Sequence, residues 1–489
     1  MSSPVDIGER LQLFVDERLV ASLRHAALTL THPEVQRESL LSPTAPWEAG
    51  RASAWSALVH HEGRFHLWYD AYAWDPKIRR IDRATHCYCY AVSQDGVHFE
   101  RPDVGLFEVD GIRDNNAVMR GTEGGPVFVD PFAPPERRFR AIIRRQSKLD
   151  LWDELVAVGT HDTWMLTSPD GMHWRRSDRP MLPFWLGATQ SVIWDDRLAK
   201  WVLYLRAHVD TGGATRRAFM RVEVARDALD DPLELPEGCT PPDPGQRQGL
   251  TDQWPIVLDA DDQDMPGAQV YVSNIIRYAR ADELYLAFIP MWYDSRNGDD
   301  ASDMLEVQLG ISRDGITWRR PWRRPLVTPG TEGTASAGQV FPVQDPVIVA
   351  DEFWLYFHGL PEDHMSAHHE KGNHHLARAI WKRDRFVSVE AFDREAGELT
   401  TGPLRFTGRR LAVNANAGAS GWIRVAIERP DGTAIEGFTD SEARTMHGNR
   451  LDHDVTWETG ARVSRLAGQP VRLRFTMQAS RLYGFQFRD

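Results

Sequence analysis

The chain has 489 residues, of which 42% are hydrophobic and 26% are charged, so it is long enough for two or more globular domains. Its formal net charge of −13 argues against a nucleic-acid or anionic-membrane partner, because both require a basic face. No long apolar run predicts a membrane span, and three cysteines make no disulfide framework.

The first twenty residues, MSSPVDIGERLQLFVDERLV, do not predict a secretory leader. A leader would show a basic segment followed by an apolar stretch, and neither is present. We therefore expect a cytoplasmic protein.

Short apolar or alternating runs that end at Gly, Pro, Asp or Asn dominate the rest of the chain and predict an all-β fold. One motif, S-x-D-G-x-x-aromatic, starts at Ser93, Ser168 and Ser312. It predicts a hairpin turn in which Asp caps the backbone, Gly takes a positive φ, and the aromatic ring packs on the sheet. We assign no chemistry to these residues.

The spacing of this motif predicts a repeat architecture. The interval from Ser93 to Ser168 is about half of the interval from Ser168 to Ser312, which indicates a unit of roughly 70 residues. Five such units fit between residues 50 and 390, each with an inner strand and a second strand. The inner strands are SALVHH, PVFVD, QSVIWD, SNIIRY and PVIVA, and the second strands are GRFHLWYDAY, RRFRAIIRRQ, AKWVLYLRAH, DELYLAFIPMW and DEFWLYFHG. We expect a five-bladed β-propeller.

The repeating sequence pattern ends near residue 390, after FVSVEA (386–391), which we expect to end the last blade. About 100 residues of further strands and a P-D-G turn follow, which is the size of a β-sandwich. We therefore predict a propeller over 1–390, with 1–50 packing on it, and a β-sandwich over 391–489.

Side chains just before each inner strand should point toward the propeller axis. These positions hold Trp55 and Ser56, Glu123, Thr189 and Gln190, Ser273 and Asn274, and Asp345. Two carboxylates facing one cavity, with Trp and amides around them, are what glycoside hydrolysis requires. Glu123 and Asp345 are therefore the predicted catalytic pair. The alternative interpretation is that both cap turns.

Five further residues are candidates for the same cavity. Glu48, in the PWE segment (46–48), is a third catalytic candidate because its loop precedes the first blade. Asp70 follows HLWY and is either close to the axis or a strand-end residue. Arg206 and His208 end the second strand of the third unit, where they could contact a sugar or a carboxylate. The predicted substrate-binding residues are Arg206 and His358, together with Trp55, Gln190, Asn274 and Asp70.

The last blade also carries a histidine cluster. His358, His364, His368, His369, His374 and His375 lie there, with Glu362, Asp363 and Glu370 between them. Imidazole and carboxylate together can bind zinc or a similar divalent ion, although the spacing matches no known ligand set. A metal around His358, His364 and His368 is therefore an alternative, and no other cofactor is predicted.

The chain resembles the five-bladed glycoside hydrolases of families 32 and 43, and more closely a group of uncharacterised bacterial family-32-like proteins. The resemblance rests on LQLFVDERLV (11–20), PWE (46–48), NNAVMRGTEG (115–124), SRDGITWRR (312–320), FVSVEA (386–391) and AGQPVRLRF (467–475). It implies a five-bladed propeller with a trailing sandwich and a glycosidase activity. Family 32 carries a nucleophilic Asp where this chain has Ala54, and a Glu where it has GATQSV.

Three functions follow from these patterns. The first is a glycosidase that acts on a furanoside or small oligosaccharide through axial carboxylates. The second is a non-catalytic carbohydrate-binding propeller, and the third is a metal-dependent sugar lyase or isomerase that uses the histidine cluster. In each case the expected partner is a small carbohydrate, with no nucleic acid and no membrane.

Overall fold

The computed structural model describes residues 3–48, 55–75, 80–109, 111–145, 162–184, 186–187, 190–210, 215–237, 254–296, 301–366 and 374–489. Within these ranges the side chains of residues 72–75, 80–85, 123, 144–145 and 210 are not described. The described chain is all-β, with short 3₁₀ turns at η1 (Pro46–Glu48), η2 (Pro135–Arg137) and η4 (Val463–Leu466). Among these residues no helix has the length and apolar character needed to cross a membrane.

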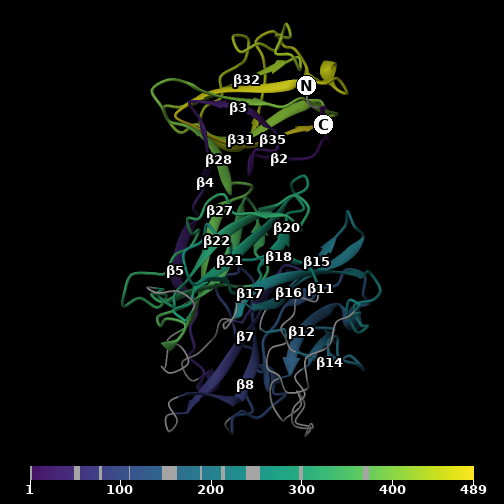
Figure 1. Ribbon diagram of the computed structural model, residues 1–489, viewed down its shortest axis with the longest axis vertical. Coiled ribbons are helices and arrows are strands. Elements are labelled where there is room, and N and C mark those ends of the chain that lie inside the picture. The colour runs from purple at the N-terminus through teal and green to yellow at the C-terminus, as the bar shows by residue number, and fades with distance from the viewer. Residues whose placement is uncertain are drawn as a thin grey trace.

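Between residues 34 and 382 the described strands form four hydrogen-bonded sheets (Figure 1). The ten-stranded one divides into two at a single residue pair, which gives the groups called sheets 1 to 5. Sheet 1 contains β6 (Ala57–His61), β7 (Arg64–Asp75), β8 (Arg80–Ser93) and β9 (Ala117–Arg120). Sheet 2 contains β10 (Thr122–Glu123), β11 (Val127–Val129), β12 (Phe139–Arg145), β13 (Thr163–Ser168) and β14 (Arg175–Arg176). Sheet 3 contains β15 (Ser191–Asp195), β16 (Lys200–Asp210), β17 (Thr215–Ala225) and β18 (Ile256–Leu258).

Sheets 4 and 5 are joined by a single residue pair, Leu305 with Gln339. Sheet 4 contains β19 (Ala268–Val270), β20 (Ile275–Arg277), β21 (Tyr285–Tyr293), β22 (Leu305–Ser312) and β23 (Trp318–Arg319). Sheet 5 contains β24 (Gln339–Pro342), β25 (Val347–Val349), β26 (Glu352–Leu360), β27 (His375–Lys382) and, as its last strand, β5 (Glu34–Leu41). In sheets 2, 4 and 5 the first strand is split into two pieces that pair with the same neighbour.

The S-x-D-G hairpins have the predicted turn geometry. In the first copy Ser93 Oγ donates to Asp95, and Asp95 Oδ1 accepts from the backbone N–H groups of Val97 and His98. Gly96 has φ 73°, a conformation that glycine adopts without strain. The copies at Ser168 and Ser312 repeat these bonds. The structural interpretation of this motif is confirmed.

The same hairpins connect neighbouring sheets. Trp68 of sheet 1 donates its indole N–H to Gly171 O of sheet 2, and Tyr204 of sheet 3 donates to Gly315 O of sheet 4. Tyr356 of sheet 5 donates to Gly96 O of sheet 1, so the last sheet contacts the first. Each glycine carbonyl therefore accepts a bond from an aromatic side chain on the second strand of the preceding sheet.

The two remaining neighbour pairs are joined differently. Between sheets 2 and 3, Phe128 packs against Trp201 with ring centroids 5.4 Å apart in a shared apolar cluster. Between sheets 4 and 5, Asn274 Nδ2 donates to Val343 O at 2.7 Å. Every sheet thus contacts the next one, and the contacts close on themselves.

The N-terminal segment contacts both parts of the molecule. β5 joins sheet 5 through β27, and Leu11, Leu13, Val15 and Leu30 share an apolar cluster with residues of sheets 4 and 5. β1 (Val5–Gly8), β2 (Gln12–Leu13), β3 (Val20–Arg24) and β4 (Ala27–Leu30) pair with strands after residue 386. The prediction that FVSVEA (386–391) ends the last blade is wrong, because β28 (Val387–Ala391) pairs with β4 and with β35 (Ser480–Arg488).

Two more sheets form the C-terminal lobe (Figure 1). Sheet 6 orders β33 (Asn449–Asp454), β31 (Arg410–Asn416), β35 (Ser480–Arg488), β28 and β4, with β2 on β35. Sheet 7 orders β3, β29 (Gly397–Thr401), β34 (Arg472–Gln478) and β32 (Trp422–Glu428), and β30 (Leu404–Phe406) pairs with β1.

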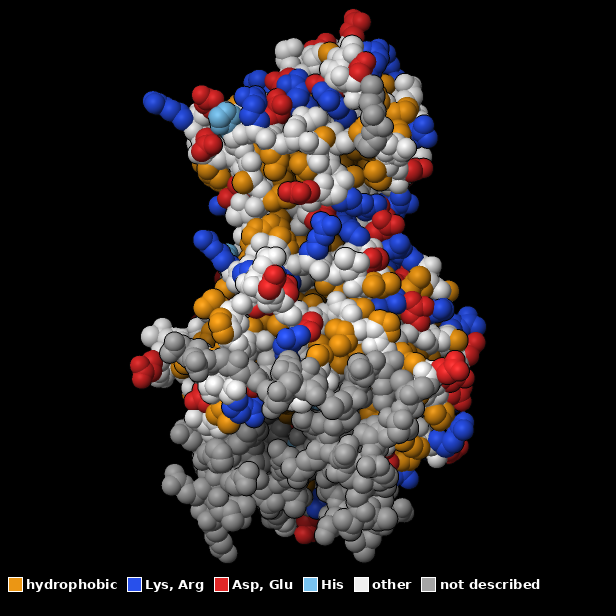
Figure 2. All heavy atoms as spheres, in the orientation of Figure 1, with side chains coloured by type: hydrophobic (Ala, Val, Ile, Leu, Met, Phe, Trp, Pro, Cys, Tyr) orange, Lys and Arg blue, Asp and Glu red, His pale blue; other side chains and the backbone are white. Residues whose placement is uncertain are grey.

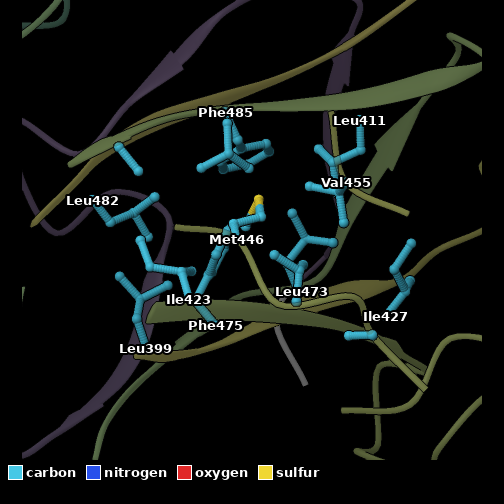
Figure 3. Close-up of a cluster of buried hydrophobic side chains, with 14 of the residues drawn as sticks. Leu399, Leu411, Ile423, Ile427, Met446, Val455, Leu473, Phe475, Leu482 and Phe485 are labelled. Carbon is cyan, nitrogen blue, oxygen red and sulfur yellow. The ribbon is translucent and has the colours of Figure 1, made fainter. Parts of the chain in front are cut away.

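Sheets 6 and 7 enclose one apolar core. Figure 3 shows Phe485 and Leu482 of sheet 6 across from Phe475 and Leu399 of sheet 7. Phe475 and Phe485 have ring centroids 6.0 Å apart. Alternation along each strand places these residues on the inward face.

The C-terminal lobe is attached to sheets 1 to 5 by polar contacts and by apolar packing. Arg385, in the turn between β27 and β28, donates to Asn414 Oδ1 at 2.8 Å and to Arg450 O at 3.0 Å. Arg313, within the third S-x-D-G copy, makes two bonds of 2.8 Å to Asp16. Figure 2 shows hydrophobic side chains at the waist between the two lobes.

Candidate functional site

The strand register defines a common level at which the first strands of sheets 1 to 5 begin, called the start side. Glu123 lies opposite Arg144 in sheet 2, and Phe341 lies opposite His358 in sheet 5. In sheet 1, Ala57 pairs with Trp68, so Asp70 lies two residues further along the second strand, toward the start side. In sheet 3, Ser191 pairs with Tyr204, so Arg206 lies two residues further along in the same way. The second-strand residues at this level are thus Asp70, Arg144, Arg206 and His358, and the first-strand residues include Trp55, Glu123 and Phe341.

Asp70 is a fully buried carboxylate on the start side. Its Oδ1 accepts a bond of 2.8 Å from the backbone N–H of Gly124 in sheet 2, and its Oδ2 lies 3.5 Å from His86 Nε2. Burial of a carboxylate is costly unless it is paired and hydrogen-bonded, and these contacts meet that need. Asp70 was predicted as either axial or a strand-end residue. The structure places it where sheets 1 and 2 meet.

Glu123 has its backbone next to this carboxylate, because it precedes Gly124. A Cβ at Gly124 would lie 2.3 Å from Trp55 O and 2.9 Å from Asp70 Oδ1, so only glycine fits there. The side chain of Glu123 lies outside the described residues. Its catalytic role stays a prediction, as do Thr189, His368 and His369, which are also outside the described part.

Glu48 is buried on the other face of sheet 1. It accepts bonds from Tyr69 OH at 2.6 Å, Arg101 Nε at 2.8 Å and Ala45 N at 2.8 Å. Successive residues of a strand point to opposite faces, so Tyr69 and its partner Glu48 lie across the strand from Asp70. These hydrogen bonds give the Glu48 carboxylate a structural role, so we do not propose Glu48 as a catalytic residue.

An aromatic group lies at the start side between sheets 1, 4 and 5. Trp55 stacks on Tyr271 with ring centroids 5.7 Å apart and an interplanar angle of 12°, and its edge meets Phe341 at 5.4 Å. Tyr271 and Phe341 are buried, whereas Trp55 is partly exposed. An aromatic face that is partly open can stack on a sugar ring.

Basic side chains gather beside these rings. Arg206 and Arg217 place their guanidinium carbons 5.2 Å and 4.8 Å from the Tyr271 ring centroid. His208, on the same strand as Arg206, is buried, and its Nε2 has no hydrogen-bond partner among the described residues. Burial, followed by the charges of Arg206 and Arg217, lowers the pKa of His208 to about 3. The imidazole is therefore neutral at pH 7 and beside two cations.

His358 joins sheets 5 and 1 at the same level. Its Nε2 lies 2.8 Å from Ser56 Oγ, and burial, with His374 and His375 nearby, lowers its pKa to about 3. His364 lies elsewhere in the group, with its ring nitrogens near Tyr271 OH and Gln339 Oε1. Within the described chain no group of three or more His, Cys, Asp or Glu side chains is placed to hold a metal. The metal alternative gains no support from them.

Gln190 and Asn274 make hydrogen bonds that join sheets to one another. Gln190 Oε1 accepts from Arg206 N at 3.2 Å, and its backbone carbonyl accepts from Gln344 Nε2. Asn274 uses its amide N–H on Val343 O. Their contacts with a substrate stay a prediction, because these bonds serve the scaffold.

Asp345 lies at a break in the first strand of sheet 5. The ladder breaks between β24 and β25, where Asp345 adopts φ 62°, and residues before and after the break pair with β26. In sheet 2, Glu123 lies on β10, before the break that separates β10 from β11. The two residues therefore differ in their place relative to the break, and a catalytic role for Asp345 stays a prediction.

Two residues of the start side were missed from the sequence. His86 and Tyr271 lie on a strand or at a strand end among apolar neighbours, where a sequence pattern indicates only a core position. His208 was named with Arg206, and alternation along the strand places both on one face.

Comparison with known proteins gave structural likenesses only. No family model matches the chain, and no curated protein matches it. A glycosyl hydrolase from Bacteroides ovatus superposes with TM-score 0.44 at 13% identity over 73% of this chain and 95% of that one. A β-1,2-mannobiose phosphorylase from Listeria innocua, in complex with β-1,2-mannobiose, gives TM-score 0.43 at 12% identity over 71% and 97%. A likeness at this level assigns no activity to this chain.

Proposed function

We propose that this chain is a carbohydrate-active enzyme that cleaves the glycosidic bond of a furanoside or small oligosaccharide at the start side of sheets 1 to 5. We further propose that these sheets are the blades of a five-bladed β-propeller, and that sheets 6 and 7 form a β-sandwich. The closed set of sheet-to-sheet contacts supports the propeller, and the shared apolar core supports the sandwich.

The observation that carries the functional proposal is the buried Asp70–His86 pair beside the backbone of Glu123. Glycosidic cleavage uses two carboxyl groups, one to protonate the leaving oxygen and one to attack carbon or activate water. Asp70 replaces Asp345 as the partner of Glu123 in our proposal, since the register puts Asp70 and Glu123 at one level. The Gly124 N–H and His86 hold the Asp70 carboxylate in one orientation.

The surroundings of the pair suit a sugar. The open face of Trp55 provides a stacking surface, and Arg206 and His358 carry hydrogen-bonding groups at the same level. Neutral His358 can donate or accept a further bond, because its Nδ1 has no partner in the part of the chain that the structure describes. Carbohydrate sites combine such aromatic faces with a few fixed polar groups.

A second candidate reaction is transfer to inorganic phosphate in place of water. The observation in its favour is the cationic group of Arg206 and Arg217 beside neutral His208. Guanidinium groups bind phosphate oxygens with paired hydrogen bonds. Hydrolysis and phosphorolysis would use the same sugar site and differ only in the acceptor.

The test is a screen of 4-nitrophenyl furanosides and pyranosides and of short oligosaccharides, run with and without inorganic phosphate. We expect cleavage of at least one substrate by the native chain and its loss in Asp70→Asn and Glu123→Gln. Asp262→Asn removes an exposed carboxylate elsewhere and is the matched control. A sugar that binds without being cleaved would favour the non-catalytic alternative, and full activity in Asp70→Asn would reject the site.

A further inference from the structure

A second cavity lies at the other end of the first strands, away from the start side. Its volume is about 470 Å³, and its lining includes Val59, Phe128, Val192 and Ile348, which come from sheets 1, 2, 3 and 5. By strand register these residues lie three to five positions beyond the start-side level. At about 3.3 Å per residue, this separates the cavity from Asp70 by roughly 10 to 17 Å.

Asp345 is the carboxylate of this cavity. It occupies the break between β24 and β25, and its backbone takes the left-handed conformation, with φ 62°. Non-glycine residues rarely hold this conformation, and residues that do so cluster at functional sites. Its side chain makes no hydrogen bond or ion pair with any described residue, in contrast to Asp70 and Glu48.

Asp345 is half-buried, so the protein shields its carboxyl group in part from solvent. This burial raises its pKa to about 7. The other titratable group on the cavity lining is His60, whose pKa is lowered by burial and by the nearby His61. At neutral pH the cavity therefore has one site for negative charge and no opposing charge on its described lining.

The walls of the cavity are aromatic and aliphatic. Trp194 and Trp201 contribute, with ring centroids 5.5 Å apart, and Phe128 packs on Trp201 at 5.4 Å. Aromatic faces attract organic cations through their quadrupoles, most strongly where water is excluded. One carboxylate with aromatic walls is a poor donor set for a metal ion, because calcium needs six to eight oxygen ligands.

We propose that this cavity binds the ammonium group of a small organic amine, with Asp345 as its counter-ion and the Trp194 and Trp201 side as its apolar wall. A primary amine with a hydrophobic substituent matches both features: its ammonium group pairs with Asp345, and its substituent packs on the apolar wall. The bound ammonium supplies the hydrogen-bond partner that the carboxyl lacks. The site is separate from the start side, so it does not depend on the sugar-cleaving proposal.

Isothermal titration of the native chain with benzylamine at about pH 8 tests this site, because the amine is then protonated and Asp345 ionised. Benzyl alcohol serves as the uncharged analogue of similar shape. We expect saturable binding of benzylamine that is at least about tenfold tighter than that of benzyl alcohol.

The Asp345→Asn variant removes the charge while keeping a residue type that tolerates positive φ. We expect it to bind benzylamine at least about tenfold more weakly, and to bind benzyl alcohol as the native chain does. Asp70→Asn and Asp262→Asn should bind benzylamine unchanged, with folding of all variants checked by thermal unfolding. Equal benzylamine affinity in Asp345→Asn and the native chain, or no saturable binding to the native chain, would overturn the proposal.

Discussion

Sheets 1 to 5 and sheets 6 and 7 are built from similar antiparallel strands but bury different side chains. The core between sheets 6 and 7 is made of aliphatic and aromatic residues such as Leu411, Ile423 and Phe475. Where the first five sheets begin, Asp70, Arg206 and His358 are buried instead. Polar burial costs free energy that an apolar core does not, so it marks the part of the molecule where chemistry is expected.

The largest expected effect is on activity at the start side. Asp70→Asn keeps the shape of the side chain and the acceptor for Gly124 N–H, but removes the ionisable group. We expect a loss of about 10² to 10⁴-fold in kcat/KM on a substrate from the glycoside screen, the range for losing a general acid or base. Substrate binding should persist in calorimetry. Unchanged kcat/KM would show that the polar burial there is structural, as in an ordinary core.

The opposite result is expected in the C-terminal lobe. Phe475→Ala empties part of the core that Phe14 and Phe485 also fill, and should lower the free energy of unfolding by about 3 to 5 kcal/mol. Chemical denaturation measures the change. The folded variant should keep its kcat, because this core contributes no side chain to the start side. A change in kcat at saturating substrate would break the distinction between the two regions.

A smaller effect tests the hairpins that connect the sheets. Gly171 has φ 77°, and a Cβ there would lie 2.4 Å from Trp68 Cζ2, so Gly171→Ala disturbs both the turn and the contact of sheets 1 and 2. We expect a loss of about 2 to 3 kcal/mol in unfolding free energy.

Gly111→Ala is the matched control for this contact. Gly111 has φ 79°, but no atom of the described residues lies within 4 Å of its added Cβ. This variant should lose only the unfolding free energy that a non-glycine residue costs at positive φ, about 1 kcal/mol. If the two variants lose equal stability in denaturant titrations, the hairpin contact with Trp68 adds nothing.

The smallest effect concerns the pH dependence of stability. The folded-state pKa of Asp345, about 7, is above the value of an unfolded Asp, so the folded state holds its proton more tightly. This group therefore stabilises the fold at low pH, and that stability is lost as pH rises from about 4 to 7. Solvent access to the carboxyl limits the effect to about 1 to 2 kcal/mol.

Asp345→Asn should show a flatter stability profile than the native chain over this pH range. Urea titrations from about pH 4 to pH 8 measure the difference. Parallel profiles for the two proteins would mean that the carboxyl is well solvated and that the cavity has no special electrostatics. Saturating benzylamine should raise native stability at the alkaline end, where the carboxylate is ionised.

Local features of the fold were predictable from sequence because they depend on neighbouring residues. The S-x-D-G turns form through bonds within a few residues, and the first and second strands follow from apolar runs bounded by turn residues. The candidate site was only partly predictable. Asp70 and Trp55 were named, whereas His86 and Tyr271 reach them from strands that the sequence does not relate to the axis.

By itself, the sequence determined the all-β character, the repeated hairpins and the set of polar residues near the strand starts, because each rests on short-range patterns of hydrophobicity and turn chemistry. Only the tertiary structure decided the register that separates Asp345 from Glu123, and the pairing of β1 to β4 with the C-terminal sheets. The pairing of β1 to β4 depends on hydrogen bonds between segments hundreds of residues apart, whereas the break at Asp345 arises within the pairing of β24 and β25 with β26. A bulge or a change of partner strand there leaves no local mark in the chain.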